Sequence, residues 1–438
     1  MTNLLHDFWI YLLPLAVFWG LFILSRKRQH QRSLAALNQA IASGMTEPAS
    51  LHPVINPNRC LGCGSCIASC PEQSGHSVLG LIAGKSTLIG PSYCIGHGAC
   101  AKACPQEAIT LVFGTATRGI DIPEVKPNFE SSVPGLFIAG ELGGMGLIRN
   151  AIVQGCQALN AIRKLPGIGQ GEQLDLVIVG AGPAGLAASL GALSHKLRFV
   201  TIEQDTLGGT VANFPRGKIV MTAPVEIPLL GRVNFRETTK EKLLEFWQGA
   251  EKKTKLKINY RERVEKIDRS GEGFVIKTDR QTYRSRSILL TLGRRGTPRK
   301  LDVSGEDLSK VVYKLIDPQE YRGKKVLVVG GGDSALEAAT SIAAEEGTQV
   351  AISYRSASFS RAKQKNRQNV DEAAAAGRLQ VLLASQVKEI TPTHVEILHN
   401  EQTLRLENDA VIICAGGILP TPFLRECGVI VETKYGTL

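Results

Sequence analysis

The chain has 438 residues, enough for two or three domains, and its 45 glycines, 43% hydrophobic residues and 5% aromatic residues are typical of an α/β protein and argue against disorder. Its net charge of +11 indicates a solvated basic surface or the steering of phosphorylated cofactors, acidic proteins or anionic lipid, and no stretch resembles a nucleic-acid-binding module. Seven of the ten cysteines lie between Cys60 and Cys104, a crowding that excludes an evenly placed disulfide scaffold.

The first predicted element is an apolar run without a charged residue from Phe8 to Leu24, which has aromatic residues near both ends. Such a run is just long enough to span a bilayer as a helix and predicts a single membrane anchor within residues 1–32. Basic residues follow the run, whereas a cleaved signal peptide would carry them before it: Arg26, Lys27, Arg28 and Arg32. This flank predicts a single-pass protein of the inner membrane whose domains lie on the cytoplasmic side, where cysteines stay reduced.

A short helix over Leu34–Ala42 and a proline-containing linker are expected in residues 33–57, before a cysteine-rich domain in residues 58–113. The first cysteine run has the spacing of a bacterial ferredoxin, in which the fourth cysteine is followed by proline: Cys60, Cys63, Cys66 and Cys70. The second run follows at an interval of 34 residues and has a histidine in its second position: Cys94, His97, Cys100 and Cys104.

The two runs together resemble a two-cluster bacterial ferredoxin domain. The resemblance implies two [4Fe–4S] clusters whose ligands cross between the runs, because the fourth cysteine of each run reaches the other cluster. One cluster would take Cys60, Cys63, Cys66 and Cys104, and the other would take Cys70, Cys94 and Cys100. His97 either ligates an iron of this second cluster or stands beside a three-cysteine cluster of lower iron content. An imidazole in place of a thiolate makes a cluster less negative and is expected to raise its reduction potential.

Residues 114–170 contain the stretch SSVPGLFIAGE over Ser131–Glu141, followed by a helical pattern. This stretch resembles the last segment of the flavin domain in the thioredoxin reductase-like flavoproteins, where it stands at the C-terminus. The resemblance implies that Gly140 and Glu141 lie at the flavin ribityl chain, although the family has an aspartate where this chain has Glu141. It also implies that a helix starting near Gly146–Arg149 points its N-terminus at the isoalloxazine, where a positive dipole end favours an anionic reduced flavin.

Residues 171–298 begin with a buried strand that runs directly into a glycine turn and a helix of small residues. Gly180 permits the tight turn, Gly182 lets the backbone approach a pyrophosphate, and Gly185 lets the helix pack closely on the strand. Glu203 ends the next strand, where an acid can bond ribose hydroxyls. The pattern predicts a dinucleotide site, and the family resemblance implies that the dinucleotide is FAD.

These segments stand in an order that differs from that of the family, because the closing segment precedes the first glycine turn. The chain stops after residues 413–438, at the point where the family would continue into that segment. We therefore predict a circular permutation with the ferredoxin domain at the new junction, which places Leu438 near residues 120–130. A truncated C-terminus beside a second, partial copy of the segment is the alternative.

A second strand, glycine turn and helix lie within residues 299–412, where Gly330, Gly332 and Ala335 occupy the three motif positions. The following strand ends without an acid and is followed by Arg355 and Arg361. A carboxylate at this position would repel a 2′-phosphate, whereas a guanidinium group binds one through two hydrogen bonds. The sequence therefore favours NADP(H) over NAD(H), with two solvated arginines as the alternative interpretation.

The redox-active cysteine pairs of thioredoxin reductases and of lipoamide-type reductases have no counterpart in this sequence. Stretches such as GGTVANFPRGKIVM look most like the bacillithiol disulfide reductase-like members, which also lack the pair. The remaining cysteines stand alone and are expected to be packed small residues: Cys156, Cys414 and Cys427.

The expected fold is α/β, with two Rossmann-like nucleotide-binding domains, a small α+β ferredoxin domain and one transmembrane helix. A flavin exchanges both hydride pairs and single electrons, so we expect an oxidoreductase that passes electrons between NADPH, FAD, two clusters and an external one-electron partner. That partner is a redox protein or a quinone at the membrane, and no acid–base residue is assigned. An NADPH-dependent disulfide reductase of a small thiol, a non-catalytic electron-wiring subunit and a homodimer also fit the sequence.

Overall fold

The computed structural model describes residues 2–48, 51–74, 77–116, 119–143, 147–170, 172–214, 219–221, 224–235, 237–294, 296–360, 362 and 364–436. The chain forms two compact units. Unit 1 comprises Met1–Gly119, Ser360–Gln364 and Lys434–Leu438, and unit 2 comprises Ile120–Phe359 and Lys365–Thr433.

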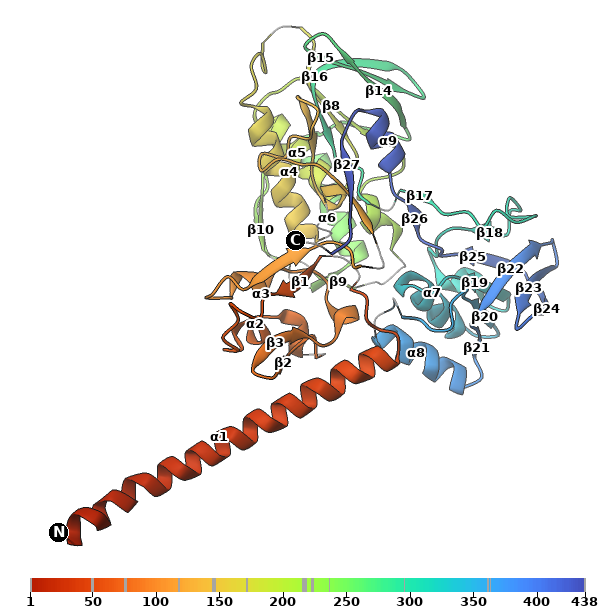
Figure 1. Ribbon diagram of the computed structural model, residues 1–438. Helices are drawn as coiled ribbons and strands as arrows, with labels where there is room; N and C mark the ends of the chain where they lie inside the picture. The colour runs from red at the N-terminus through yellow and green to blue at the C-terminus, as the bar shows by residue number, and fades with distance from the viewer. Residues whose placement is uncertain are drawn as a thin grey trace. The chain divides into compact units, whose positions relative to one another are not determined.

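Unit 1 begins with helix α1, Thr2–Ala42, which runs without a break over 41 residues (Figure 1). The residues expected as a short helix, Leu34–Ala42, are helical, but they form the last part of α1, because the polar stretch after Arg26 contains no glycine or proline that would end the helix before them. The helix ends at Gly44, whose φ is 66°, and the Met45 N–H donates to the Ala40 carbonyl over 2.7 Å.

The structure describes the side chains of α1 from Leu12 onward. Over the described part of the chain, no helix combines the length and the apolarity needed to cross a membrane. The anchor expected over Phe8–Leu24 therefore stays a prediction.

The rest of unit 1 is a small α+β domain with two similar halves. Its elements are β1 (His52–Ile55), α2 (Ser65–Ala68), η1 (Pro71–Ser74), β2 (Leu79–Ile82), β3 (Lys85–Leu88), η2 (Pro91–Tyr93), α3 (Ala99–Lys102) and β4 (Ile109–Val112). The pairing crosses between the halves, because β1 pairs with β4 and β2 pairs with β3, both antiparallel. A core with three cysteines fills the space between the strands and the short helices: Cys66, Val78, Leu79, Cys94, Cys100 and Ile109.

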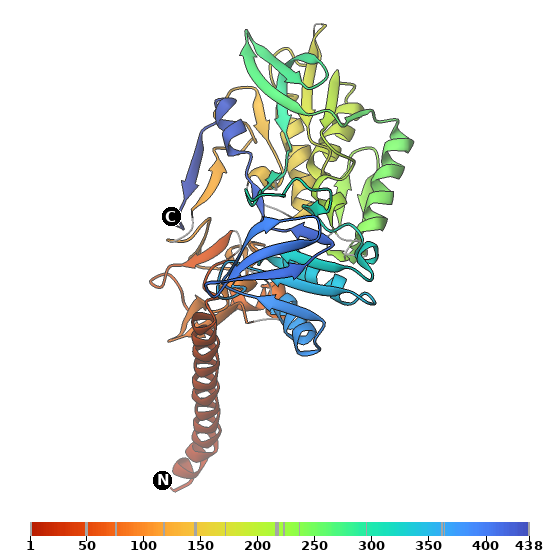
Figure 2. The same ribbon diagram turned by 90° about the vertical axis from the view of Figure 1, so that its right-hand side faces the viewer.

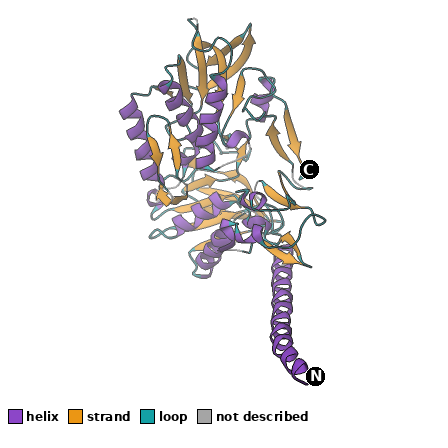
Figure 3. Ribbon diagram, turned by 90° about the vertical axis from the view of Figure 1, so that its left-hand side faces the viewer, coloured by secondary structure: helices purple, strands orange, loops and turns teal. Residues whose placement is uncertain are grey.

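The first part of unit 2 is a mixed sheet with helices packed beside it (Figure 3). Its elements are β5 (Ile120–Pro123), β6 (Leu136–Ile138), η3 (Glu141–Gly143), α4 (Ile148–Ile162), β7 (Leu174–Val179), α5 (Pro183–Ser194), β8 (Phe199–Glu203), η4 (Gly209–Asn213), β9 (Ile219–Met221), β10 (Val225–Ile227), β11 (Gly231–Val233), β12 (Glu237–Thr239), α6 (Lys240–Thr254), β13 (Ile258–Tyr260), β14 (Val264–Ser270), β15 (Gly273–Thr278) and β16 (Thr282–Leu290). The strand order is β13-β8-β7-β16-β15-β14, with β6 also paired to β16. Strands β13, β8, β7, β16 and β6 pair in parallel, and the buried apolar residues of β7 explain why it reads as a continuous hydrophobic run.

The second part of unit 2 contains a five-stranded parallel sheet. Its elements are β17 (Thr297–Pro298), β18 (Val311–Val312), η5 (Pro318–Tyr321), β19 (Lys325–Val329), α7 (Asp333–Ala343), β20 (Gln349–Ser353), α8 (Gln364–Ala375), β21 (Leu379–Leu382), β22 (Ser385–Ile390), β23 (His394–His399), β24 (Gln402–Glu407), β25 (Ala410–Ile413), β26 (Gly417–Ile418), α9 (Thr421–Glu426) and β27 (Val431–Lys434). The parallel strands stand in the order β18-β25-β19-β20-β21, and β22, β23 and β24 form a separate antiparallel sheet. The expected α/β architecture with two Rossmann-like sheets is confirmed.

The last described strand of the chain, β27, pairs with β5 at the start of unit 2 (Figure 2). The Glu124 N–H donates to the Ile430 carbonyl over 2.9 Å, and the Thr433 hydroxyl donates to the Asp121 carboxylate over 2.7 Å. These contacts make the strands antiparallel and bring the end of β27 beside the start of β5. Leu438, for which a position near residues 120–130 was predicted, lies outside the described residues.

Candidate functional site

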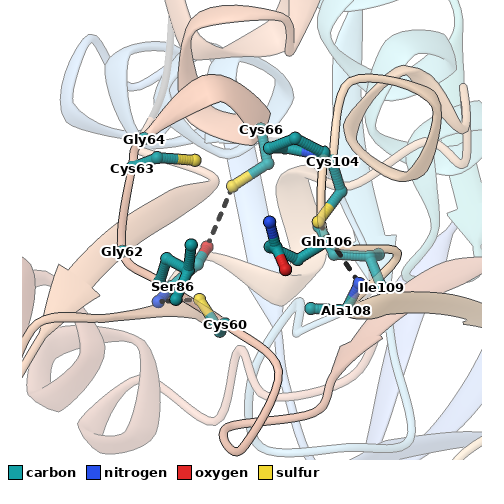
Figure 4. A pocket seen from close by; sticks show the side chains of 12 residues that line it. Cys60, Gly62, Cys63, Gly64, Cys66, Ser86, Cys104, Gln106, Ala108 and Ile109 are labelled. Atoms are coloured by element: carbon teal, nitrogen blue, oxygen red, sulfur yellow. Dashed lines mark hydrogen bonds between the residues drawn. The ribbon is translucent and has the colours of Figure 1, made fainter.

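Four cysteine side chains from both halves of the small domain line one pocket (Figure 4): Cys60, Cys63, Cys66 and Cys104. Backbone N–H groups point at two of the sulfur atoms. The Ser86 N–H donates to Cys60 Sγ over 3.4 Å, and the Ala108 N–H donates to Cys104 Sγ over 3.3 Å. Hydrogen bonds to the sulfur atoms are among the features that tune an iron–sulfur cluster.

Two serine hydroxyls lie against the other two sulfur atoms of this pocket. Ser65 Oγ is 3.4 Å from Cys63 Sγ, and this hydrogen bond lowers the pKa of the exposed Cys63 thiol. Ser86 Oγ is 3.2 Å from Cys66 Sγ, but burial outweighs this contact and raises the pKa of Cys66. The pocket therefore combines a buried apolar wall with donors aimed at sulfur.

The donor set of this pocket fits a four-iron cubane. Among the described residues, no group of three or more metal-ligating side chains is close enough to hold a single metal ion. Ligands of a cubane do not need to meet around one ion, because each thiolate binds a different iron. Four sulfurs around one pocket, with N–H donors behind them, are the arrangement that such a cluster requires.

The second set of predicted ligands also comes together. Burial raises the pKa of Cys100 to about 11 against the opposing effect of the Ala101 N–H, with smaller contributions from Cys94 and Cys70. Burial also raises the pKa of Cys94, with smaller contributions from Cys70 and Glu72. Cys94 and Cys100 belong to one buried cluster, and Cys70 packs against it.

His97 occupies the place in its half that Cys63 occupies in the other. The glycines on either side have matching left-handed φ values, 67° and 82° at Gly62 and Gly64 against 80° and 74° at Gly96 and Gly98. The His97 Nε2 atom is 3.9 Å from Glu72 Oε1. Burial lowers the pKa of His97 against the opposing effect of Glu72, so the imidazole is neutral at pH 7 and retains a lone pair for a metal.

The first glycine turn of unit 2 stands between β7 and α5. A Cβ atom at Gly185 would lie 1.9 Å from the Gly180 carbonyl oxygen, so the helix can approach the strand only without a side chain. Gly180 has a φ of 108° and also has no room for a Cβ. A Cβ at Gly182 would meet no protein atom nearer than Gly209 Cα at 4.0 Å. Gly182 therefore faces an open cradle at the helix N-terminus, which fits a pyrophosphate.

Glu203 ends β8 next to this cradle, and its side chain is buried. Its two carboxylate oxygens accept hydrogen bonds from the backbone N–H groups of Ala181, over 2.7 Å, and Asp205, over 2.8 Å. Burial raises the pKa of Glu203, and these hydrogen bonds oppose that rise. Each oxygen has a further lone pair, so the carboxylate can also accept from a ribose hydroxyl.

The closing segment brings Gly140 to the same sheet edge. Gly140 has a φ of 84°, and a Cβ there would lie 3.1 Å from Ala184 Cβ in α5. Glu141 follows and lies toward the loop after β16, because a Cβ at Gly293 would be 4.0 Å from its carboxylate. Arg149 is exposed in the first turn of α4, which begins at Ile148, whereas Gly146 lies outside the described residues.

The second glycine turn repeats this design between β19 and α7. Gly330 has a φ of 144°, and a Cβ there would lie 2.4 Å from the Cys414 carbonyl oxygen. Gly332 again faces open space, and Ala335 is fully buried where the helix meets the sheet. Arg355 is exposed just after β20, whereas Arg361 lies outside the described residues.

Two residues that support the flavin-type turn were not predicted. The Thr291 hydroxyl, at the end of β16, donates to the carbonyl oxygens of Val179 and Gly180, both over 2.9 Å. The Gln154 side chain accepts from the Gly140 N–H over 2.9 Å. Thr291 ends an apolar run as a polar residue, which is a usable signal, whereas Gln154 lies in a helix without any motif.

Two of the three lone cysteines, Cys156 and Cys427, pack as expected. Burial raises the pKa of Cys156, and burial raises the pKa of Cys427 to about 12, so neither thiol forms a thiolate readily at pH 7. Both side chains pack against apolar cores of unit 2.

Comparison with known proteins places these features in a family. Residues 177–437 match the family model described as pyridine nucleotide-disulphide oxidoreductase, and residues 52–105 match the model of the 4Fe-4S dicluster domain. The chain is 32% identical to the ferredoxin–NADP reductase of Ignicoccus hospitalis over 42% of this chain and 57% of that protein. It is 28% identical to the ferredoxin–NADP reductase of Thermus thermophilus over 60% of this chain and 78% of that protein.

Among solved structures, the bacillithiol disulfide reductase from Bacillus cereus has a TM-score of 0.52 and 24% identity, over 59% of this chain and 82% of that chain. This likeness concerns the fold. The chain spans 51% to 57% of the length of its curated relatives from Ignicoccus hospitalis, Clostridium pasteurianum and Lactococcus lactis. The family model matches more than half of the residues, and the two glycine cradles beside parallel strands agree with this match. The chain belongs to the pyridine nucleotide-disulphide oxidoreductase family.

Proposed function

We propose that this chain is an NADPH-dependent flavin oxidoreductase that passes electrons between FAD, two iron–sulfur clusters and an external one-electron partner. One observation carries the proposal: a single chain combines two dinucleotide-type cradles with a pocket lined by four cysteines. The relatives from Ignicoccus hospitalis and Thermus thermophilus are ferredoxin–NADP reductases. Here the ferredoxin-like domain is part of the same chain, so the chain carries its own first electron partner.

The residues of each cradle have separable tasks in this proposal. FAD, when bound, converts between the hydride pairs of NADPH and the single electrons of a cluster. Gly182 gives the pyrophosphate access to the N-terminus of α5, and the Glu203 carboxylate accepts from the ribose. Gly332 opens the corresponding cradle at α7, and Arg355 supplies positive charge for a 2′-phosphate.

The proposal includes a circular permutation of the flavin domain. Residues 120–170 contribute β6 to the parallel sheet through β16, and Gly155 of α4 packs so tightly on α5 that a Cβ would lie 2.2 Å from the Ala184 carbonyl oxygen. The family match begins at residue 177 and leaves this segment uncovered, as expected when a segment has moved ahead of the rest. The pairing of β27 with β5 supports the same reading.

The proposal also includes attachment to the inner membrane, with the domains on the cytoplasmic side. Large apolar side chains are exposed along the described part of α1 before its basic residues: Leu13, Leu15, Phe18, Trp19 and Leu21. Exposed apolar side chains in this number need a cover, and a bilayer supplies one. A quinone or a membrane-bound redox protein would then be within reach as the external partner.

Anaerobic reduction of the full-length protein with NADPH tests the electron path. We expect the flavin absorbance to bleach and the EPR signals of reduced clusters to appear within the turnover time. A variant with Cys63→Ser and Cys100→Ser is the matched control, and it should bleach the flavin without the cluster signals. Flavin bleaching with clusters that stay oxidised in the parent protein would contradict the internal path. Turnover of a disulfide substrate by the control variant at the full rate would favour a thiol reductase.

A further inference from the structure

The 34-residue repeat places the two cysteine sets in equivalent surroundings, so their differences can be compared position by position. Residues 51–72 correspond to residues 85–106 in this comparison. Three of the four ligand positions hold a cysteine in both halves. The fourth ligand position holds Cys63 in one half and His97 in the other. Two nearby positions also differ, because Ser65 and Gln106 around the first pocket correspond to Ala99 and Glu72 around the second set.

These three differences concern one hydrogen-bonding requirement. A thiolate accepts hydrogen bonds, and Ser65 lies 3.4 Å from Cys63 Sγ as its hydroxyl partner. A neutral imidazole that binds a metal through one nitrogen has an N–H on the other, which requires an acceptor instead. Accordingly, the half with His97 has Ala99, without a hydroxyl, at the position of Ser65. Around the second set, the carboxylate of Glu72 takes the position that the Gln106 amide takes around the first pocket.

The geometry identifies that acceptor. Glu72 Oε1 lies 3.9 Å from His97 Nε2, and the side chains are 31% and 26% exposed. Gln106, the counterpart of Glu72, lines the first cysteine pocket, where Figure 4 shows it near Cys66 and Cys104. Glu72 therefore lies beside the imidazole, two residues after Cys70, where its carboxylate can partner the ring nitrogen that does not bind metal.

We infer that Glu72 positions His97 as a ligand of the second cluster, with Nε2–H directed to the carboxylate and Nδ1 directed to iron. The inference rests on the proposed function only in requiring that the second set holds a cluster. It makes Glu72 a positioning residue, because its carboxylate acts through the imidazole. The Glu72 carboxylate also supplies the negative charge that a fourth thiolate would carry, but this charge lies behind the imidazole and not on an iron ligand.

Pulsed EPR of the full-length protein tests the assignment. The protein is labelled with histidine that carries ¹⁵N at Nδ1 only and is reduced with dithionite, so that cluster reduction does not depend on NADPH or FAD. We expect strong coupling of the Nδ1 nitrogen to one of two cluster signals, and its loss in His97→Cys. Weak coupling is expected when the label is at Nε2. Absence of nitrogen coupling in the parent protein, or strong coupling to Nε2, would overturn the assignment.

Glu72→Gln tests the positioning role and is isosteric, so folding is preserved. We expect a fall of about 10- to 100-fold in iron retention by the second site against a chelator, the effect typical of losing the outer partner of a ligand. The midpoint potential of the second signal should rise, because a negative charge near the cluster is removed, while the first signal stays unchanged. Unchanged retention, potential and Nδ1 coupling would overturn the role of Glu72.

Gln106→Glu is the matched control at the equivalent place of the first set. It adds a carboxylate where there is no histidine, so it should lower the potential of the first signal without adding nitrogen coupling to that signal, while the coupling of the second signal persists. A parent protein that shows the Nδ1 coupling but whose clusters are not reduced by NADPH would refute the proposed electron path and leave this inference intact.

Discussion

At the first glycine turn, one added methyl group is expected to have opposite effects at two positions of the same motif. Gly185→Ala places a Cβ 1.9 Å from the Gly180 carbonyl oxygen and forces α5 away from β7. We expect a loss of about 1–3 kcal/mol in the free energy of unfolding, as in other overpacked sites. Thermal unfolding of the apoprotein measures this loss.

Gly182→Ala is the matched variant, since its Cβ enters the open cradle and approaches no protein atom closer than 4.0 Å. The stability of the apoprotein should change by less than about 1 kcal/mol, the cost of a poorer helix N-cap. FAD affinity should fall by at least about tenfold, which corresponds to about 1.4 kcal/mol. Normal FAD binding by this variant would show that the cradle does not hold the pyrophosphate.

The choice between the two nicotinamide cofactors is also expected to depend on a single side chain. Arg355 is exposed immediately after β20, where an acidic residue would favour NADH. Loss of a charge-assisted hydrogen bond costs about 1.5–3 kcal/mol, so Arg355→Ala should raise the KM for NADPH by about 10- to 100-fold. Steady-state reduction of a dye acceptor measures KM, and NADH is the control substrate. An equal loss with both cofactors would remove the 2′-phosphate role.

At the scale of elements, Asp175 ties three segments of the flavin-type domain together. Its carboxylate accepts from the Gly169 N–H over 2.8 Å, from the Arg198 N–H over 2.9 Å and from the Arg198 guanidinium over 3.0 Å. Burial alone would raise the pKa of Asp175, but the bonds from Arg198 and Gly169 outweigh it and lower the pKa. The loop after α4 is thereby joined to β7 and to the start of β8.

This lowered pKa predicts a pH-dependent contribution to stability. The folded pKa lies below the unfolded value of about 3.9, so the contribution is complete above about pH 4 and is lost as the pH falls through the folded pKa. Asp175→Asn should lower the free energy of unfolding by about 1–3 kcal/mol at pH 7, with a smaller difference at acid pH. Urea unfolding at both pH values measures it, and Asp268→Asn, an exposed pair with Lys266, is the control. A constant difference across pH would contradict the ionic origin.

Several elements could be predicted because their requirements are local in sequence. The tight turn at Gly180 and the close contact at Gly185 each follow from the residues on either side, so the glycine pattern was sufficient. The end of α1 at Ala42 was placed correctly, but its continuity between Leu24 and Leu34 was not predicted, because a polar stretch without glycine or proline is compatible with either a helix or a linker. The contact between Gln154 and Gly140 depends on how α4 packs, which no motif records.

In the candidate metal site, too, the features that are local in sequence could be predicted and those that depend on folding could not. Cysteine spacing was enough to predict which thiols line the first pocket, because ferredoxin spacing is a rigid pattern. The contact between His97 and Glu72 was not predicted, since the two residues belong to different halves of the repeat. Only the crossing of the halves, seen in the pairing of β1 with β4, brings them together.

At the scale of the whole molecule, the proposed permutation predicts that the flavin part can be restored to the usual order of its family. Lys434 ends β27 beside the start of β5 at Ile120, so a two-residue Asn-Gly turn should join them as a hairpin. The chain would be opened at residue 171 and residues 1–119 removed. We expect this protein to bind FAD in a stoichiometry close to that of the parent, because termini that lie close together tolerate permutation.

Visible absorbance and FAD content after desalting measure the outcome. The control has the same opening at residue 171 and the same residues removed, but lacks the new link. Its two pieces are then not joined covalently, so it should bind FAD more weakly. A relinked protein that is folded but free of FAD would contradict the permutation and favour a truncated domain beside a partial copy.

The short helices of the cysteine domain have a further consequence for how metal is gained and lost. Cys66 lies in α2 and Cys70 follows its end, so one helical turn holds a ligand of each set. Cys100 and Cys104 are placed in the same way around α3. Loss of metal from one cysteine set would destabilise a helix that also carries a ligand of the other set. Because β1 pairs with β4, both halves of the domain would be affected. Loading is therefore expected to be cooperative, with fully loaded and empty chains more abundant than half-loaded ones.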